Sequence, residues 1–489
     1  MKNLRLLVCT VMSFMAAQVF SQDIHVSLGN VTYIHSAEEV GDMTFGNSGT
    51  TLTIQGKTYT LSEITGMEVL EEAYEEKTVR VNYTGESAAV KVSGDIASEV
   101  TATVNGAHVT VTVNPEYEEE IAYDLTGSSD NGSFTMNGDY KSELRLENLQ
   151  LTNTTGAAIS INNGKRLDLI LVGENTLTDG TNGTQKACFE IGGHPEISGQ
   201  GTLNIIANSS HGIDAGDYML IEGGTINIQA VGDGLRAEQY FHLKNGTVNI
   251  QSVGDGIDVG FKGVKKGTKD QYPSNGFAYL FGGNLSIVAT GPASRGLKAD
   301  STVCISGTTV DITVSGNAYY DSEEDDIKSS AGIKSGGDFE MVKGSLNILA
   351  TGSGGKGTNI DYDINVSGGE ITIVTLGGRF EYGDDDAKPQ GLKANGSMTL
   401  TGGLCKVAVL DKKATAFKKD YSLVINGATT ISIGGKPYVP LSPGSQNCRS
   451  YYPQVNIGGN SYIYDNIEFY LPTGFTNSTG YVITSSPDM

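Results

Sequence analysis

Apolar and polar residues alternate along most of this chain, in short runs that glycine separates. Residues 221–228 read Ile-Glu-Gly-Gly-Thr-Ile-Asn-Ile, and residues 243–250 and 366–373 follow the same order. A period of two residues is typical of a strand with one buried face, whereas an amphipathic helix needs a period near 3.6. We therefore expect an all-β protein.

A second pattern follows in each repeat and consists of a glycine, an apolar residue, a polar residue and a small residue. It occurs, for example, at residues 212–215, 256–259 and 391–394. A third apolar run then leads into the next repeat. The repeats begin at Ile197, Ile221, Leu243, Leu280, Ile305, Met341, Val366, Leu400 and Ile425, so the basic spacing is 22–25 residues and three repeats carry insertions.

Three short strands in each repeat predict one coil of a single-stranded right-handed parallel β-helix. Neighbouring coils stack about 4.8 Å apart, so equivalent positions form columns. The apolar residue of the second strand builds an inward column of Ile213, Leu235, Ile257, Leu297, Ile333, Leu392 and Phe417. The glycine before each of them is expected to form a corner with positive φ.

The regular repeat occupies only part of the chain. Residues 1–21 combine a basic start, a short apolar run and a small last residue, which is typical of a secretory signal peptide cleaved near Ser21–Gln22. Residues 22–118 predict a small N-terminal β domain, residues 119–435 the β-helix, and residues 436–489 a C-terminal cap of the kind solenoids need. We expect a monomer that is secreted, periplasmic or at the cell surface, without a membrane-spanning segment.

The chain is strongly acidic. Its formal net charge is −23, and removal of Lys2 and Arg5 with the signal peptide gives −25 (−23 − 2). Nucleic acid needs a basic surface, so it is an unfavourable partner. Neither G-x-S-x-G, H-E-x-x-H nor a phosphate loop is present, and we assign no catalytic residue. Four cysteines, Cys188, Cys304, Cys405 and Cys448, follow the signal peptide without metal-ligand spacing, and their pairing stays open.

Two insertions combine aromatic residues with clustered carboxylates. Residues 317–326 and 379–386 leave the same corner two coils apart, roughly 10 Å, so their tips are able to meet. Oxygen ligands at this density suit Ca²⁺, although a solvated acidic loop is the alternative. A second candidate is the column of Gly-Asp-Gly corners. Their stacked carboxylates either share a metal ion, or the corners are simple turns whose charges alternate from coil to coil. The candidate metal ligands are Asp233, Asp255, Asp258, Asp325, Asp326, Asp384, Asp385 and Asp386.

The outward position of the second strand becomes a basic stripe in the later coils. It reads Asp214, Arg236, Asp258, Lys298, Lys334, Asn359, Lys393 and Lys418. Neighbouring lysines repel one another unless an anion neutralises their charge. Either an acidic glycan or the nearby acidic loops would supply that anion. Aromatic loop residues either stack on sugar rings or pack down on the coil. The candidate substrate-binding residues are Arg236, Lys298, Lys334, Lys393, Tyr320 and Tyr382.

With the repeat laid out, the chain resembles secreted bacterial proteins of the carbohydrate-binding-domain-containing family, whose fold is distantly similar to that of pectate lyases. The resemblance covers about residues 140–435. It rests on the Gly-Gly-Thr-Ile-Asn-Ile strands, on residues 232–235 and 254–257, and on the Gly-Leu-Lys-Ala and Gly-Ile-Lys-Ser strands. It implies polysaccharide binding and bound calcium. The chain departs at residues 292–295, where Pro-Ala-Ser-Arg replaces a third Gly-Asp-Gly corner.

We therefore expect a non-catalytic polysaccharide-binding protein that favours acidic, uronate-containing glycans of plant type or bacterial origin and holds structural calcium. Two alternatives stay open. One is a calcium-dependent polysaccharide lyase that acts by β-elimination, with Lys298 or Lys334 as the base. The other is a structural cell-surface adhesin.

Overall fold

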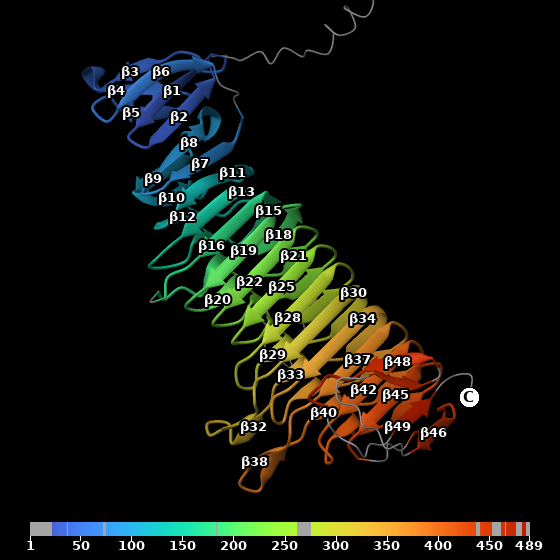
Figure 1. Ribbon diagram of the computed structural model, residues 1–489. Helices are drawn as coiled ribbons and strands as arrows, with labels where there is room; N and C mark the ends of the chain where they lie inside the picture. The colour runs from blue at the N-terminus through green and yellow to red at the C-terminus, as the bar shows by residue number, and fades with distance from the viewer. Residues whose placement is uncertain are drawn as a thin grey trace, which may run out of the picture.

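The structure is a computed structural model that describes residues 22–36, 38–71, 75–181, 183–261, 275–436, 441–451, 461–464, 466–475 and 482–485. The predicted signal peptide, residues 1–21, lies outside this range. The described part is all-β, as predicted, with two short 3-10 turns, η1 (Asn47–Gly49) and η2 (Gly94–Ile96). Figure 1 shows the strands stacked along one long axis, with the first strands at one end and the last at the other. None of the described helical turns is long or apolar enough to cross a membrane.

Two of the N-terminal strands hydrogen-bond directly to the repeats, while three others form a separate sheet of their own. The N-terminal strands are β1 (Gln22–Leu28), β2 (Val31–Ser36), β3 (Thr44–Gly46), β4 (Thr51–Ile54), β5 (Lys57–Thr60), β6 (Gly66–Glu71), β7 (Thr78–Thr84), β8 (Ser87–Ser93), β9 (Val100–Asn105) and β10 (Ala107–Val113). The separate sheet consists of β3, β4 and β5. The strand β7 pairs in parallel with β11, and β10 pairs in parallel with β12. Both sheets of the repeats therefore continue past residue 118, where we placed a domain boundary. That boundary stays a prediction.

The repeats form two sheets, which we call the large sheet and the small sheet. Within the described residues, the large sheet has 27 strands and the small sheet 13. The repeat strands of the large sheet are β11 (Ile121–Ser129), β13 (Ser142–Thr152), β15 (Arg166–Val172), β16 (Glu174–Thr178), β18 (His194–Gly199), β19 (Thr202–Ala207), β21 (Met219–Ile221), β22 (Thr225–Ala230), β24 (Tyr240–Leu243), β25 (Thr247–Ser252), β27 (Phe277–Leu280), β28 (Asn284–Ala289), β30 (Val303–Val314), β34 (Phe339–Ala350), β36 (Ile364–Val366), β37 (Glu370–Thr375), β41 (Met398–Leu400), β42 (Leu404–Val409), β44 (Leu423–Ile425) and β45 (Thr429–Gly434).

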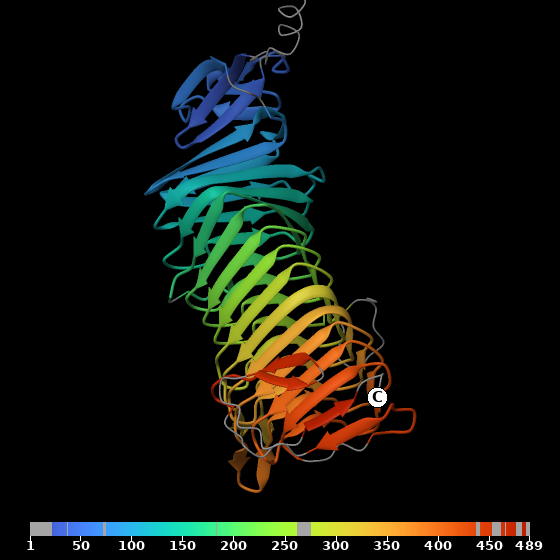
Figure 2. The same cartoon turned by 45° about the vertical axis from the view of Figure 1, so that its right-hand side comes forward.

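The small sheet carries the second strand of each repeat, and β9 and β10 extend it. Its other strands are β12 (Gly132–Asn137), β14 (Ile159–Asn162), β17 (Ala187–Ile191), β20 (His211–Ala215), β23 (Leu235–Ala237), β26 (Ile257–Val259), β29 (Arg295–Ala299), β33 (Ala331–Ser335), β35 (Lys356–Ile360), β40 (Gln390–Lys393) and β43 (Thr415–Lys418). Figure 2 shows the strands following one another along the long axis.

The predicted single-stranded right-handed parallel β-helix, with three separate strands in each coil, is wrong. The strands β13 and β30 each run through a predicted corner and pair with both neighbouring stacks of the large sheet. Their pairings close a parallel barrel of twelve strands, in the order β13, β15, β18, β21, β24, β27, β30, β28, β25, β22, β19, β16 and back to β13, with extra strands beyond it. The physical reason is that the backbone bends at these corners without leaving the sheet. Near Ser306, for example, a register shift absorbs the bend.

The predicted inward column is present. Ile213, Leu235, Ile257, Leu297 and Ile333 are direct neighbours in register, and Leu392 pairs with Phe417. All seven side chains are at most 4% exposed. They belong to one apolar core that extends from the N-terminal strands to the last repeats.

The glycines before this column have a different role from the one predicted. None of Gly212, Gly234, Gly256, Gly296, Gly332 and Gly391 has a positive φ. Instead, they lack room for a side chain. A Cβ on Gly256 would lie 2.4 Å from the carbonyl oxygen of Gly296 and 2.4 Å from Cγ2 of Ile287. Glycine is needed here because the second strand packs directly against the first.

The C-terminal strands cover the last repeats. They are β46 (Cys448–Tyr451), β47 (Ser461–Tyr464), β48 (Ile467–Tyr470) and β49 (Val482–Ser485). The strand β49 pairs antiparallel with β45. A small second core joins Val374, Ala408 and Ile433 of the large sheet to Phe469 and Phe475. These contacts bury apolar positions on the face of the final coils, and the C-terminal cap of residues 436–489 stays a prediction.

We predict that Gly256→Ala destabilises the protein, because the added methyl group overlaps backbone and Ile287. Overpacking of this kind costs about 1–3 kcal/mol, and thermal melting measures the loss. The matched control is Gly260→Ala, since a Cβ there meets nothing within 4 Å. Equal melting of both variants and the wild type would contradict the packing explanation.

Candidate functional site

The two acidic insertions form hairpins that touch each other. The first consists of β31 (Tyr319–Asp321) and β32 (Asp326–Lys328), and the second of β38 (Phe380–Tyr382) and β39 (Asp385–Ala387). The rings of Tyr320 and Tyr382 stack with their centroids 3.9 Å apart and their planes at 12°. The expectation that the insertions are able to meet is therefore confirmed. The stack covers one face of each ring, so only the opposite faces are open to a ligand.

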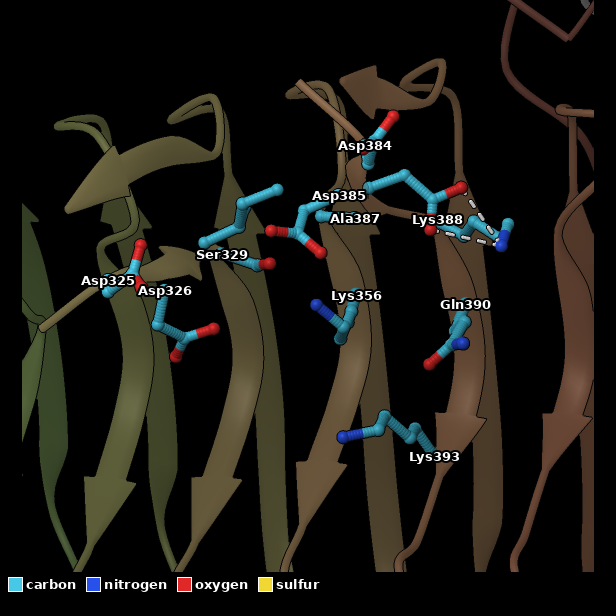
Figure 3. Close-up of a pocket in the computed structure, with 12 residues that line it drawn as sticks. Asp325, Asp326, Ser329, Lys356, Asp384, Asp385, Ala387, Lys388, Gln390 and Lys393 are labelled. Atoms are coloured by element: carbon cyan, nitrogen blue, oxygen red, sulfur yellow. Dashed lines mark hydrogen bonds and ion pairs between the residues drawn. The ribbon is translucent and has the colours of Figure 1, made fainter. Parts of the chain in front are cut away.

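A pocket of about 460 Å³ lies beneath the hairpins. Its residues come from both hairpins and from the small sheet: Asp325, Asp326, Ile327, Ser329, Lys356, Asp384, Asp385, Asp386, Ala387, Lys388, Gln390 and Lys393. Figure 3 shows Asp384 and Asp385 toward the hairpins, Asp326 at about the level of Lys356, and Lys393 farthest from the hairpins. Lys356 belongs to β35 and Lys393 to β40. The pocket thus has an acidic rim and a basic floor.

Lys356 is the most unusual residue of the pocket. It is 9% exposed, and its Nζ donates a hydrogen bond to the carbonyl oxygen of Gly354 at 3.5 Å. Within the described part of the chain, no carboxylate forms an ion pair with it. Burial, with added repulsion from Lys393, lowers the pKa of Lys356 to about 7. A lysine near half-protonation at neutral pH is suited to bind an anion or to exchange a proton.

Lys356 is not among the site residues predicted from the sequence, although the repeat pattern contains a signal for it. The site residues were taken from the position after the apolar residue of the second strand. Lys356 stands instead just before the repeat glycine, in register with Arg295 and Ala331 on one side and Gln390 on the other. Alignment of residues 355–358 with the other second strands would have placed it there.

The acidic rim is largely paired within the protein. Asp386 contacts Arg379 and Lys388, and the hydrogen bond from Lys388 is the main cause that lowers the pKa of Asp386. Asp326 lies 3.2 Å from Lys328, and Asp325 accepts a hydrogen bond from the hydroxyl of Tyr320. Among the described residues, no three His, Cys, Asp or Glu side chains come together as a group that could hold a metal ion. As placed, these carboxylates therefore do not form a calcium cage, and calcium binding stays a prediction.

The basic stripe has the predicted register, with Asp214, Arg236, Asp258, Lys298, Lys334 and Asn359 aligned, and Lys393 beside Lys418. Most of the charged side chains in this stripe form ion pairs with neighbouring residues. Lys298 pairs with Asp258 at 2.7 Å and Lys334 pairs with Asp361. Arg236 lies 3.8 Å from Asp214. Lys393 differs, because it donates to the neutral Asn359 at 2.6 Å, while burial and then Lys334 lower its pKa.

The Gly-Asp-Gly carboxylates connect one coil to the next. Asp233 Oδ1 accepts from the backbone N–H of Asp255 at 2.7 Å, and Asp255 Oδ1 accepts from the N–H of Arg295 at 2.7 Å. His211 precedes them as the acceptor for the N–H of Asp233. The sequence allows either an ion-binding site or turns with a charge ladder at the Gly-Asp-Gly corners. The contacts favour turns whose carboxylates hydrogen-bond to the next coil. Asp258 faces Lys298 rather than the other two carboxylates.

We predict that Asp255→Asn stabilises the protein at alkaline pH. Burial raises the pKa of Asp255 to about 6, above its ordinary value near 4. An acid with a raised pKa in the folded state loses stability as pH rises from about 4 through 6. Asparagine keeps the Oδ1 acceptor without the charge, so the variant should gain roughly 1–3 kcal/mol at pH 8 and little at pH 4.

Urea unfolding at the two pH values measures this difference. Asp255→Ala is the control, because it also removes the acceptor for the N–H of Arg295 and should destabilise the protein at both pH values. A gain for Asp255→Asn that is equal at pH 4 and pH 8 would refute the proposed cause.

The chain is similar to a known protein family and to a solved structure. A family model described as carbohydrate-binding domain-containing protein matches residues 105–359. This range runs from the end of β9 into β35 and includes Lys356, while the second hairpin and Lys393 lie beyond it. No curated protein matches the chain. A solved structure of the polysaccharide lyase-like protein from C. thermocellum, a gadolinium derivative, is similar at 21% identity, with 54% of this chain and 96% of that chain covered and a TM-score of 0.43.

Proposed function

Because the chain belongs to the carbohydrate-binding domain-containing protein family, we propose that it binds polysaccharide without cleaving it. The observation that carries the proposal for a specific site is Lys356, a buried ammonium group that faces the pocket without a carboxylate partner. We further propose that the protein acts as a secreted or surface-exposed monomer.

The preferred ligand is an acidic glycan. A buried charge without a partner is costly, so a ligand carboxylate that pairs with it gains more than it would at an exposed lysine. Lys298 and Lys334 already have carboxylate partners. We therefore assign the uronate subsite to Lys356 and Lys393, and give Arg236, Lys298 and Lys334 a supporting role along the stripe. Tyr320 and Tyr382 do not line the pocket, and we assign their outer ring faces an additional contact with the glycan at the hairpins.

Calcium remains part of this proposal only at the rim. Asp384 and Asp385 face the pocket mouth beside the paired Asp386. Carboxylates this close repel one another unless a cation answers them. A rim cation would also reduce the repulsion between the rim and an acidic glycan.

We predict that Lys356→Gln weakens binding of oligogalacturonate at pH 6 by about tenfold or more, because a charged hydrogen bond is lost. Wild-type binding should also weaken between pH 6 and pH 8, as Lys356 loses its proton near pH 7, and the variant should lose this dependence. Isothermal titration calorimetry at both pH values measures the effect.

The matched control for this variant is Lys343→Gln. It removes the same charge from an exposed lysine of β34 that does not line the pocket. Equal loss in both variants would mean that net charge alone governs binding, and unchanged binding by Lys356→Gln would remove the proposed subsite.

We predict that added Ca²⁺ raises the melting temperature of the chelator-treated protein and that Asp385→Ala reduces this rise. The reason is that a cation bound at the rim stabilises only the folded state. Glu340→Gln, which removes an exposed carboxylate of β34, is the control and should keep the full response. A wild-type melting temperature that ignores both Ca²⁺ and chelator would disprove the rim site.

One observation favours a second candidate function, a polysaccharide lyase. A pKa near the operating pH is what a general base needs, and Lys356, whose pKa is lowered to about 7, lines a pocket of about 460 Å³. Fold analogy adds nothing to this, because similar folds host unrelated chemistry. Growth of the ultraviolet absorbance of an unsaturated uronate during incubation with polygalacturonate would establish the lyase. Flat absorbance with retained binding supports the non-catalytic proposal.

A further inference from the structure

The outer face of the large sheet carries columns of uncharged side chains across β19, β22, β25 and β28. One column aligns Asn204, Asn227, Asn249 and Ser286 in direct register. The next column aligns Ile206, Gln229, Gln251 and Val288, two residues further along each strand. We call the exposed surface of these eight residues the amide face.

The amides of this face are held in a fixed direction. Asn227 Nδ2 donates to Asn204 Oδ1 at 2.8 Å, and Asn249 Nδ2 donates to Asn227 Oδ1 at 2.9 Å. A carboxamide has two N–H donors and two acceptor lone pairs, so each ladder contact leaves capacity for a ligand. The ladder therefore presents ordered donors and acceptors with the spacing of the strands, about 4.8 Å.

The amide face is hollowed and entirely uncharged. Two adjoining hollows of about 350 and 250 Å³ share Ile206, Gln229, Gln251 and Val288, and no residue that lines either of them is charged. The chain as a whole has 56 acidic and 33 basic residues. Apolar side chains border the amides, with Val231 48% and Val253 49% exposed.

One of the two columns continues into a part of the sheet that the chain itself covers, whereas the asparagine column continues through Asp311, Asn347 and Thr372 to Lys406. The column of Val288 leads through Thr313 to Leu349, Val374 and Ala408. There the side chains become apolar and pack against Phe469 and its neighbours. The chain therefore covers the part of this column that is wholly apolar, whereas the open part carries two glutamines between Ile206 and Val288. This contrast argues against a protein segment as the occupant of the open part.

We propose that the amide face is a second glycan-binding surface and that it takes an uncharged polysaccharide. Hydroxyl groups match the ordered amides, and the C–H faces of sugar rings match Ile206, Val231 and Val253. In the described part of the chain, no charged side chain that could form an ion pair with a uronate lines the two hollows. The amide face lies wholly within residues 105–359, the range matched by the carbohydrate-binding family. The inference rests on the carbohydrate-binding part of the proposed function but not on the Lys356 pocket.

The test compares the purified protein with the double variant Gln229→Glu/Gln251→Glu. Both side chains are exposed, so two carboxylates can be added without disturbing the core. The probes are insoluble cellulose, amylose and galactomannan, with polygalacturonate as the acidic probe. The control is Asn365→Glu, an exposed position of β36 on the other strand stack. Depletion from solution and affinity electrophoresis measure binding, and melting curves verify folding.

We expect the wild type to retain at least one uncharged polysaccharide, with little dependence on salt. The double variant should bind it about tenfold or more weakly, and Asn365→Glu should bind it like the wild type. Lys356→Gln should leave this binding intact, which separates the amide face from the lysine pocket. Failure to bind any uncharged probe, or equal binding by the folded double variant, would overturn the inference. Retention of polygalacturonate would still support the pocket in either case.

Discussion

The parallel hydrogen-bond register between successive coils is the constraint on which the rest of this protein depends. It places Ile213, Leu235 and Ile257 directly over one another and so builds a core that no single coil could form. It requires glycine at the positions where the second strand approaches the first, as at Gly256. The same register repeats every outward side chain in a column, and the candidate binding surfaces are such columns.

A column of equal charges would destabilise the stack, and the structure shows how this is avoided. Asp258 forms an ion pair with Lys298, and Asp361 forms one with Lys334. Asp233 and Asp255 bind backbone N–H groups of the following coil instead of facing each other as bare carboxylates. Against this background Lys356 is an exception, since it is buried beneath two acidic hairpins and hydrogen-bonded only weakly to Gly354. An exception of this kind at a pocket points to a binding role.

Alternation and glycine spacing were enough to predict an all-β stack, its inward column and its outward register. They could not reveal how the strands join at corners, because a bend that stays within a sheet and a corner that leaves it have the same residues. The sequence of β30 therefore led to separate strands where the structure has one strand of 12 residues. The glycines of the second strand were assigned to φ rather than to space, since only packing distinguishes the two causes.

The site was predicted in part for a similar reason. The contact between the two insertions followed from their spacing, and Tyr320 and Tyr382 confirm it. Charge partners such as Asp361 for Lys334 depend on side-chain direction, which a sequence pattern does not contain. Lys356 was missed because the search followed one repeat position, and the amide face was missed because uncharged columns were read as ordinary strand surface.

The most direct measurement of the central claim is an NMR titration of the Lys356 side chain, with and without an acidic oligosaccharide. We expect a pKa near 7 in the free protein and a clear rise when oligogalacturonate binds, because a ligand carboxylate stabilises the ammonium form. A Lys356 pKa near the ordinary value of about 10.4, or one that oligogalacturonate leaves unchanged, would contradict the claim that this pocket binds acidic glycan.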